Sequence, residues 1–373
     1  MNTPKKIKVM QVLGGLWCGG TETFVMNMYH SVDKEKVQFD FLVHEKSKAH
    51  YDDEVLSLGG QIHRISDRHE VGTIRYVINL VRLLRKLNPD IVHSHAMFNS
   101  GIVMLAAFLA GIKKRICHAH SAKDESGNKL SRRIYRLIMR MCIKAFSTNQ
   151  IACSDVAAEF LFSNKHRSKR AVPIINGIDV DKHLSVAVHE VDVIRKQLGI
   201  SEENYVIGFV GRLVAVKNPL FLIKVFEEIR KINNKAIMVI VGEGSLKIPI
   251  QQELKKRDLI GHVRLTGNRT DVPGIMCIFD VLVLPSLFEG LSIVTLEAQA
   301  SGLPCILSDN VPTTADVGLG LIRYISIRDE EGWVKAAASK QQKVTDHNKI
   351  RTAFKYHGFD TASASNKLLK LYG

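Results

Sequence analysis

The chain has 373 residues, 46% of them hydrophobic and 24% charged, which is the composition of a soluble globular protein long enough for two domains. Its longest apolar run, residues 101–112, falls short of the ~20 residues that span a bilayer, and its first residues lead into a strand rather than a signal peptide. The six cysteines show no paired spacing, which favours buried thiols in a reducing compartment over a disulfide set or a zinc site.

The formal net charge of +15 is unevenly distributed along the chain. Residues 1–180 carry 27 Lys and Arg against 16 Asp and Glu, whereas residues 181–373 carry 25 against 21. The basic excess of the first half predicts an anionic partner such as a membrane surface, a phosphorylated ligand or nucleic acid. The alternative is that these charges only solvate the surface.

Short apolar segments in the first half predict strands, and amphipathic stretches such as residues 72–87 predict helices between them. The predicted strands span residues 7–13, 39–44, 61–65, 91–95, 115–120, 150–154 and 172–176. Alternation of strands with helices is typical of a parallel sheet with helices on both faces.

The same alternation restarts in the second half of the chain. Strands are predicted over residues 206–213, 236–244, 262–268, 281–286 and 304–308, and the polar residues 177–192 between the two series predict a linker. The fold class is therefore α/β with two Rossmann-like domains. We expect an N-terminal domain over 1–180, a C-terminal domain over 181–355, and a C-terminal helix over 356–373 that packs back towards the N-terminal domain.

In such sheets, ligands lie outside the carboxyl ends of the strands, so chemistry is expected directly after strands. The first such turn, residues 14–22, is rich in glycine and allows the backbone to approach a phosphate. It does not match the dinucleotide fingerprint G-x-G-x-x-G, which disfavours an oxidoreductase with Glu45 as its ribose-binding acid. A plain tight turn is the alternative.

Two cations follow the first strand of the second half. Arg212 and Lys217 precede a helix that is predicted to start near residues 218–219, and such a pair suits a diphosphate. Two further glycine turns, residues 241–246 and 265–271, either seat a base through backbone groups or are ordinary turns.

Two carboxylates flank the start of another predicted helix. Glu289 follows the apolar strand 281–286, and Glu297 lies in the second turn of a helix that begins near Ser292 and stops at Gly302. Free N–H groups at the helix start favour an anion, so the two acids would accept hydroxyl groups on either side of a phosphate. Ordinary acids on a helix surface are the alternative.

These motifs together resemble the retaining glycosyltransferases of family 4, which have the GT-B fold of two Rossmann-like domains facing each other across a cleft. The resemblance rests on the two glutamates spaced by seven residues within 285–304, and on residues 210–218, 241–244, 176–179 and 19–24. It extends from the first strand to the final residues 359–373, and within the family it is greatest to bacterial enzymes of capsule and exopolysaccharide assembly.

The resemblance implies a role for each matching residue. Arg212 and Lys217 would neutralise the leaving diphosphate, and Gly20 would approach it from the other domain. Glu297 would bind the ribose hydroxyls, and Glu289, with the backbone of the next three residues, would hold the donor sugar. The following residues complete the donor site: Gly290, Leu291, Ser292, Gly267 and Asn268.

A histidine at the end of the fifth strand usually contacts the transferred sugar in this family. The resemblance assigns that role to His118, with His120 as the alternative. The Asp-x-Asp sequence at residues 179–181 imitates a metal motif of another glycosyltransferase fold, but it lies in the predicted linker, and we expect neither a metal nor another cofactor.

The function expected from the resemblance is hexosyl transfer, with retention, from a nucleotide-sugar such as a UDP-sugar to a glycan or lipid-linked acceptor. No carboxylate is placed as a hydrolase-type nucleophile, so the leaving group would be stabilised electrostatically. A glycosyltransferase fold that binds nucleotide-sugar without catalysis is the alternative. The expected partners include no nucleic acid.

Residues 130–146 predict a basic amphipathic helix. Arg132, Arg133, Arg136, Arg140 and Lys144 recur at helical spacing, while Ile134, Leu137, Ile138, Met141 and Cys142 occupy the other side. This pattern predicts binding to an anionic membrane, which would make the protein cytoplasmic and peripheral at the inner face of the cell membrane. The alternative is an ordinary outer helix with solvated arginines.

Overall fold

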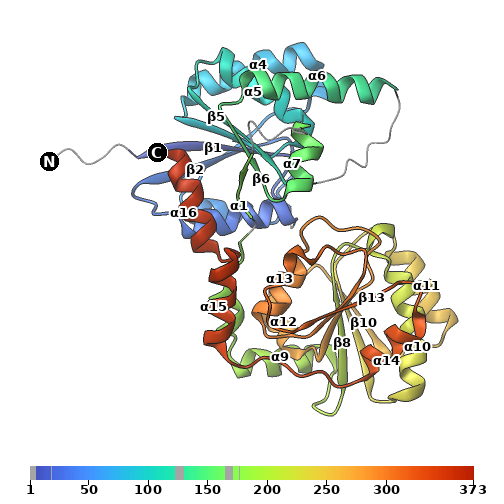
Figure 1. Cartoon of the computed structure of the whole chain (residues 1–373). Coiled ribbons are helices and arrows are strands. Elements are labelled where there is room, and N and C mark those ends of the chain that lie inside the picture. Colours follow the sequence, from blue (N-terminus) through green and yellow to red (C-terminus); the bar gives the residue numbers. More distant parts are fainter. Residues whose placement is uncertain (1–5, 18, 122–129, 164–170, 176) are drawn as a thin grey trace. The chain divides into compact units, whose positions relative to one another are not determined.

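The structure is a computed structural model, and it describes residues 6–17, 19–121, 130–163, 171–175 and 177–373. The chain divides into two compact units, shown in Figure 1. Unit 1 comprises Met1–Gly177 together with Thr361–Gly373, and unit 2 comprises Ile178–Asp360. Each unit is built around one parallel sheet, so the prediction of two Rossmann-like α/β domains is confirmed.

The sheet of unit 1 has the strand order β3-β2-β1-β4-β5-β6-β7, with all pairs parallel. Its strands are β1 (Ile7–Leu13), β2 (Val37–Val43), β3 (Ile62–Arg64), β4 (Ile91–Ser94), β5 (Lys114–Ala119), β6 (Asn149–Ala152) and β7 (Val172–Pro173). All seven lie within two residues of the predicted starts, because buried parallel strands read as continuous apolar runs.

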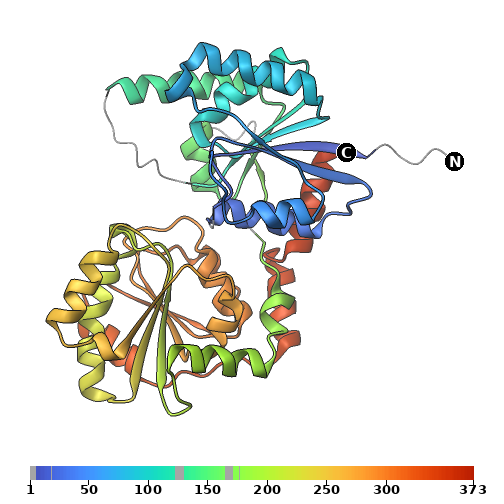
Figure 2. The same ribbon diagram turned by 180° about the vertical axis from the view of Figure 1, so that it is seen from behind.

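Helices cover both faces of this sheet (Figure 2). One face is packed by α1 (Gly20–Ser31), α2 (Asp52–Ser57) and α16 (Thr361–Tyr372), and the other by α4 (Thr73–Leu87), α5 (Ser100–Leu109), α6 (Leu130–Phe146) and α7 (Asp155–Phe162). The short α3 (Arg68–Val71) and the 3-10 helix η1 (Met97–Asn99) lie between these elements. Helix α16 comes from the end of the chain but packs on α1, and it supplies Leu368 and Tyr372 to the core of unit 1.

The sheet of unit 2 has the order β10-β9-β8-β11-β12-β13, again parallel. Its strands are β8 (Tyr205–Val210), β9 (Ala236–Val241), β10 (Val263–Gly267), β11 (Val281–Leu284), β12 (Cys305–Ser308) and β13 (Ile322–Ile325). β13 was not predicted, because this short edge strand is only partly buried and follows a run of glycine turns.

The helices of unit 2 also lie on both faces of its sheet, as Figure 1 shows. They are α8 (Val180–Leu184), α9 (Val188–Leu198), α10 (Pro219–Ile232), α11 (Lys247–Lys256), α12 (Val272–Ile278), α13 (Ile293–Ala300), α14 (Glu330–Ala338) and α15 (His347–His357), with 3-10 helices η2 (Ala215–Lys217), η3 (Ile260–His262) and η4 (Thr313–Ala315). No helix of the described residues is long and apolar enough to cross a membrane.

The predicted linker at 177–192 is wrong, because α8 and the start of α9 occupy this stretch. The Asp179 side chain accepts from the Lys182 backbone N–H and caps α8, and the His183 Nδ1 lies 2.9 Å from the Ser301 hydroxyl. The carboxylate of Asp181 pairs with Arg351 of α15. Both aspartates of the Asp-x-Asp sequence therefore have structural partners within unit 2.

The five cysteines that lie in the described residues are free, and Cys117, Cys153 and Cys305 are buried. Burial raises the pKa of Cys153 to about 11, so this thiol is unreactive at neutral pH. These observations agree with the prediction of buried thiols. Cys18 lies outside the described residues.

Candidate functional site

Three glycine turns lie side by side at the carboxyl ends of β10, β9 and β8. The Gly242 N–H donates to the Gly267 carbonyl at 2.8 Å, and the Gly211 N–H donates to the Val241 carbonyl at 2.9 Å. Gly242 has φ +131°, and a Cβ there would lie 2.1 Å from the Gly211 oxygen. Backbone therefore packs directly on backbone at this edge, where only glycine fits.

The next strand in the sheet, β11, brings Glu289 against Lys217. The Glu289 Oε1 accepts from the Lys217 Nζ at 2.5 Å and from the Ser286 hydroxyl at 2.7 Å. The Leu287 N–H donates to the Val216 carbonyl at 2.7 Å, which ties the two loops together. The two side chains are only 17% and 9% exposed, so two residues far apart in the sequence form one half-buried ion pair.

The other predicted donor-site residues of unit 2 lie at the same edge. Arg212 is exposed in the turn after β8, next to Gly211, and α10 begins at Pro219 as predicted. Gly267 ends β10 with φ +69°, and Asn268 follows it at the surface. Arg212 follows β8 and Gly267 ends β10, two parallel strands separated only by β9, so the structure brings these residues to one edge of the sheet.

Helix α13 starts one residue after Ser292, close to the predicted position. Ser292 is buried, and its hydroxyl accepts from the Thr295 hydroxyl at 2.8 Å instead of capping the helix. Gly290 and Leu291 are half-buried just before this helix start. An added Cβ on Gly290 would meet no atom within 4 Å, so the fold itself leaves room in front of α13.

Glu297 lies in the second turn of α13 and differs from Glu289 in its surroundings. Burial raises the pKa of Glu297 to about 7, and the Lys182 ammonium of α8 opposes this shift only in part. Within the described parts of the chain, no hydrogen bond or ion pair reaches its carboxylate. A carboxylate that is largely desolvated and without a protein partner is costly, and this marks Glu297 as a candidate ligand-binding residue.

In unit 1, histidines gather on the α1 side of the sheet. His93 and His95 come from β4, and His118 and His120 come from the end of β5, with ring centroids 4.0 to 5.3 Å apart. The Phe24 ring of α1 covers His118 and His120 at 5.2 and 5.3 Å. His118 is fully buried, whereas His120 follows the last residue of β5 and is partly exposed.

Hydrogen bonds order these histidines in a chain that starts at the C-terminal helix. The Gln11 amide donates to the Tyr372 hydroxyl at 3.2 Å, and its carbonyl accepts from the His95 Nε2 at 2.9 Å. The neutral His95 ring therefore has its lone pair on Nδ1, which accepts from the His120 Nε2 at 2.7 Å. The Tyr372 hydroxyl also lies 2.8 Å from the His93 Nδ1.

Burial keeps His93, His95 and His118 neutral. It lowers the pKa of His93 to about 3 and holds those of His95 and His118 well below the usual value. The ring nitrogens of His93, His95 and His118 lie within 4.8 Å of one another, which makes these residues a potential metal-ligand set. However, both nitrogens of His95 already form hydrogen bonds, so we interpret His93, His95 and His120 as a hydrogen-bond network with Gln11 and Tyr372. Both ring nitrogens of His118 are buried without a hydrogen-bond partner among the described residues.

Gly20 is the first residue of α1 and lies at the surface. Its φ is not in the left-handed region, and an added Cβ would meet no atom within 4 Å. The fold therefore does not require glycine at this position, unlike at Gly242. A glycine that the fold does not need suits close approach of a ligand.

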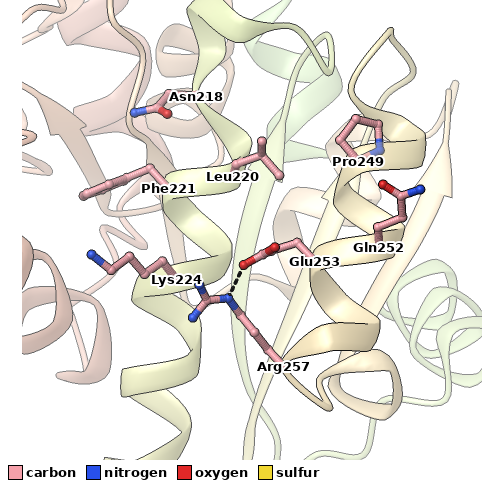
Figure 3. Close-up of a pocket in the computed structure, with 8 residues that line it drawn as sticks. All are labelled: Asn218, Leu220, Phe221, Lys224, Pro249, Gln252, Glu253 and Arg257. Atoms are coloured by element: carbon pink, nitrogen blue, oxygen red, sulfur yellow. Dashed lines mark hydrogen bonds and ion pairs between the residues drawn. The ribbon is translucent and has the colours of Figure 1, made fainter.

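A hollow of about 530 Å³ lies between α10 and α11 (Figure 3). The charged side chains that line it are paired within unit 2, since Lys224 contacts Glu330, and Arg257 contacts both Glu227 and Glu253. Asn218, which precedes α10, and Phe221 of α10 also line it. We assign no function to this hollow.

The sequence interpretation missed several residues that the structure adds to the two candidate sites. In unit 2 these are Ser286 and Lys182, and in unit 1 they are Gln11, His93, His95 and Tyr372. One signal for the unit 1 set was present. Histidines occupy alternate positions in two predicted strands, which places them on one face of a buried sheet.

Comparison with known proteins gives matches over most of the chain. Residues 18–182 match the family described as Glycosyltransferase Family 4, and residues 190–319 match the family described as Glycosyl transferases group 1. The putative glycosyltransferase EpsF of Bacillus subtilis is 35% identical over 379 residues, which cover 100% of this chain and 97% of EpsF.

Two further relatives and one solved structure extend this comparison. The UDP-Gal:α-D-GlcNAc-diphosphoundecaprenol α-1,3-galactosyltransferase of Escherichia coli is 32% identical, covering 63% of this chain and 62% of its own. The capsular polysaccharide biosynthesis glycosyltransferase CapH of Staphylococcus aureus is 27% identical, covering 83% of each. The Anabaena protein HepE in complex with UDP and glucose superposes with a TM-score of 0.79 at 16% identity, covering 98% of each chain.

Proposed function

The chain belongs to the family 4 glycosyltransferases and has their GT-B fold, and we propose that it transfers a sugar, with retention, from a UDP-sugar to a glycan or lipid-linked acceptor. The relatives support the finer terms of this proposal. One is named for capsular polysaccharide biosynthesis, another for a UDP-sugar donor and a diphosphoundecaprenol acceptor, and HepE was solved with UDP. We extend the proposal to surface polysaccharide biosynthesis on this basis.

The observation that carries the proposal is the pair of unlike glutamates at one edge of the unit 2 sheet. Glu289 is held by Lys217, whereas Glu297 is largely buried with a pKa near 7 and no hydrogen-bond partner in the described residues. A ribose ring supplies two hydroxyl donors and would satisfy Glu297. We propose that Glu297 binds ribose, and that Glu289 with the backbone of Gly290, Leu291 and Ser292 holds the donor sugar.

Two other residues of the proposed nucleotide-sugar site carry positive charges that complement the diphosphate. Arg212 and Lys217 would neutralise the diphosphate as negative charge develops on it, and Gly20 of unit 1 would leave room for its oxygens. The turn at Gly267 and Asn268 would seat the base. Because Glu289 is already engaged by Lys217 and Ser286, it is a poor candidate for a covalent nucleophile, which agrees with an attack by the acceptor on the same face as the leaving group.

For the histidine that contacts the transferred sugar, we propose His120 instead of His118. His118 points into the core under Phe24 and is fully buried, so a sugar hydroxyl cannot reach it without opening the core. His120 follows the end of β5, is partly exposed, and has its Nε2 proton directed to His95. Its position outside the carboxyl end of a strand is where ligands bind in such sheets.

A ligand panel tests the proposal directly. Thermal unfolding with UDP, GDP, ADP and NAD should show stabilisation by UDP, about 2.7 kcal/mol at ~100 times its dissociation constant. A screen of UDP-sugars should then show donor turnover, and NMR of the product with an added acceptor reports the anomeric configuration. Stabilisation by NAD alone, or nucleotide binding without any turnover, would contradict the proposal.

A matched pair of variants tests the diphosphate site. Arg212→Ala should lower turnover by roughly 10²–10³-fold, the usual effect of losing one preorganised charge-stabilising group. Lys224→Ala is the control, because this lysine lies in α10 and pairs with Glu330 at the surface. Near-normal turnover of Arg212→Ala, or an equal loss in both variants, would refute the assignment.

A further inference from the structure

Helix α6 carries an apolar stripe on its solvent side. Its members are 48–72% exposed, and they are Leu130, Ile134, Leu137, Ile138 and Met141, which we call the α6 stripe. Their spacing of three and four residues places them on one face of the helix. Most of the apolar residues predicted for this helix therefore face solvent.

The opposite side of α6 already packs on the core of unit 1. Met139 and Ile143 are buried there, and Tyr135, Cys142 and Phe146 pack against the same cluster. The helix is therefore held in place without the α6 stripe. Five exposed aliphatic side chains in one line are unfavourable in water and mark an interaction surface.

Two basic residues, Arg133 and Lys144, are exposed beside the α6 stripe. The guanidinium groups of Arg136 and Arg140 lie instead over the ring of the buried Phe98, at 5.8 and 5.3 Å, and Arg140 also donates to the Phe160 carbonyl at 2.6 Å. Arg133 and Lys144 therefore place positive charge next to the apolar line, whereas Arg136 and Arg140 help to hold α6 on the core.

The neighbouring helices continue the same pattern. α4 contains four Lys or Arg residues, α6 contains five, and α4, α5 and α6 contain no Asp or Glu. Further apolar side chains are exposed beside them, namely Ile74 and Ile78 on α4, and Phe108 and Leu109 at the end of α5. Figure 1 shows these helices as one layer on a face of the unit 1 sheet.

We propose that this layer docks on an anionic lipid surface, with the α6 stripe inserted at the boundary between headgroups and acyl chains. The charges favour anionic headgroups, and the aliphatic stripe favours the acyl boundary, which is the combination found in interfacial helices. Nucleic acid would satisfy the charges but leave the aliphatic side chains without a partner. A symmetric contact with a second copy would place basic residues against basic residues.

Co-sedimentation of the full chain with vesicles tests the proposal. The protein should sediment with phosphatidylglycerol-containing vesicles at low salt and far less at about 0.5 M salt, where charges are screened within a few ångströms. Vesicles of phosphatidylcholine alone should retain little protein. Arg133→Gln with Lys144→Gln should lower the affinity about 25-fold, since each basic residue near an anionic leaflet contributes roughly fivefold.

The apolar contribution needs its own variant and control. Leu137→Ser with Met141→Ser should lower vesicle affinity at least tenfold, because both side chains would lose their burial in the acyl boundary. Ile248→Ser with Ile260→Ser is the matched control, since these two residues are 65% and 60% exposed in unit 2. UDP-induced stabilisation and circular dichroism confirm that each variant is folded.

Three outcomes would overturn the proposal. The first is wild-type protein that does not sediment with anionic vesicles at low salt. The second is a stripe variant that sediments like the wild type, which would reduce the surface to a non-inserting basic patch. The third is a stripe variant that turns a dimer into a monomer in sedimentation velocity while vesicle binding is unchanged, which would assign the stripe to a second copy of the chain.

Discussion

Replacing Glu297 by Gln should make the unliganded protein more stable at pH 8 while it weakens nucleotide binding. Burial raises the pKa of this carboxyl to about 7 from the reference value of 4.5, so the folded chain is less stable when Glu297 is ionised. Gln has nearly the same size and carries no charge. A substitution that stabilises the fold and impairs binding is the expected behaviour of a functional residue whose burial is unfavourable without its ligand.

The magnitude follows from the pKa shift. A change from 4.5 to about 7 corresponds to about 3 kcal/mol at ~1.4 kcal/mol per unit, and partial exposure of the side chain reduces this to about 2–3 kcal/mol. The folded pKa lies above the unfolded one, so the folded state binds the extra proton between pH 4.5 and 7. The contribution of the Glu297 carboxyl to the free energy of unfolding of the wild type is therefore greatest below about pH 4.5, and it is lost as the pH rises through 7.

Urea unfolding at pH 5 and pH 8 measures the effect. The free energy of unfolding of Glu297→Gln should exceed that of the wild type by about 2–3 kcal/mol at pH 8 and by much less at pH 5. Calorimetry with UDP should show weaker binding to the variant, because an amide oxygen accepts a hydrogen bond from a hydroxyl group less strongly than a carboxylate oxygen does.

Glu289→Gln is the matched control, because it removes the same charge from a residue that has a partner. It leaves Lys217 half-buried without its carboxylate, and the free energy of unfolding should fall by about 1–3 kcal/mol. The reasoning about Glu297 is refuted if Glu297→Gln lowers stability at pH 8, or if its difference from the wild type is the same at both pH values.

Three other substitutions separate roles in the fold from roles at the site. Gly20→Ala should leave the free energy of unfolding unchanged or raise it by up to ~1 kcal/mol, as alanine favours helices, yet lower donor turnover; unchanged turnover would remove Gly20 from the site. Gly242→Ala should destabilise by more than about 2 kcal/mol in urea unfolding, because its Cβ would overlap the Gly211 oxygen, and normal stability would contradict the close packing. Tyr372→Phe should shift the ring ¹⁵N–¹H resonance of His95 and lower turnover about tenfold, whereas an unchanged spectrum would show that the hydroxyl does not order the histidines.

The strands were predictable because their burial leaves a direct trace in the sequence. β8 and β11 are continuous apolar runs that end in glycine or serine turns, and this is how doubly covered parallel strands read. β13 and α8 were not found. The first is a half-buried edge strand, and the second is a single polar turn whose stability comes from its cap at Asp179 and from the contact of His183 with α13.

The candidate site was predictable only as a set of residue types. The motifs pointed to Lys217 and Glu289 separately, but their contact depends on β8 and β11 being neighbours, which sequence spacing does not specify. The difference between the surroundings of Glu289 and Glu297 could not be predicted from the sequence either, because the neighbouring side chains come from other elements. For the histidine, the motif pointed to the end of the fifth strand, and only the structure shows that His118 is fully buried whereas His120 is partly exposed.

The histidine network also explains why the last residues of the chain belong to unit 1. Gln11 and His93 lie in the two central strands β1 and β4, where a polar side chain is tolerated only if its hydrogen bonds are satisfied. The Tyr372 hydroxyl contacts the Gln11 amide and the His93 Nδ1, and it is carried by α16, whose Leu368 covers the same face of the sheet. The polar residues that order His120 therefore depend on a helix that follows unit 2 in the chain, so this face of unit 1 can reach its final packing only after the whole of unit 2 has been made.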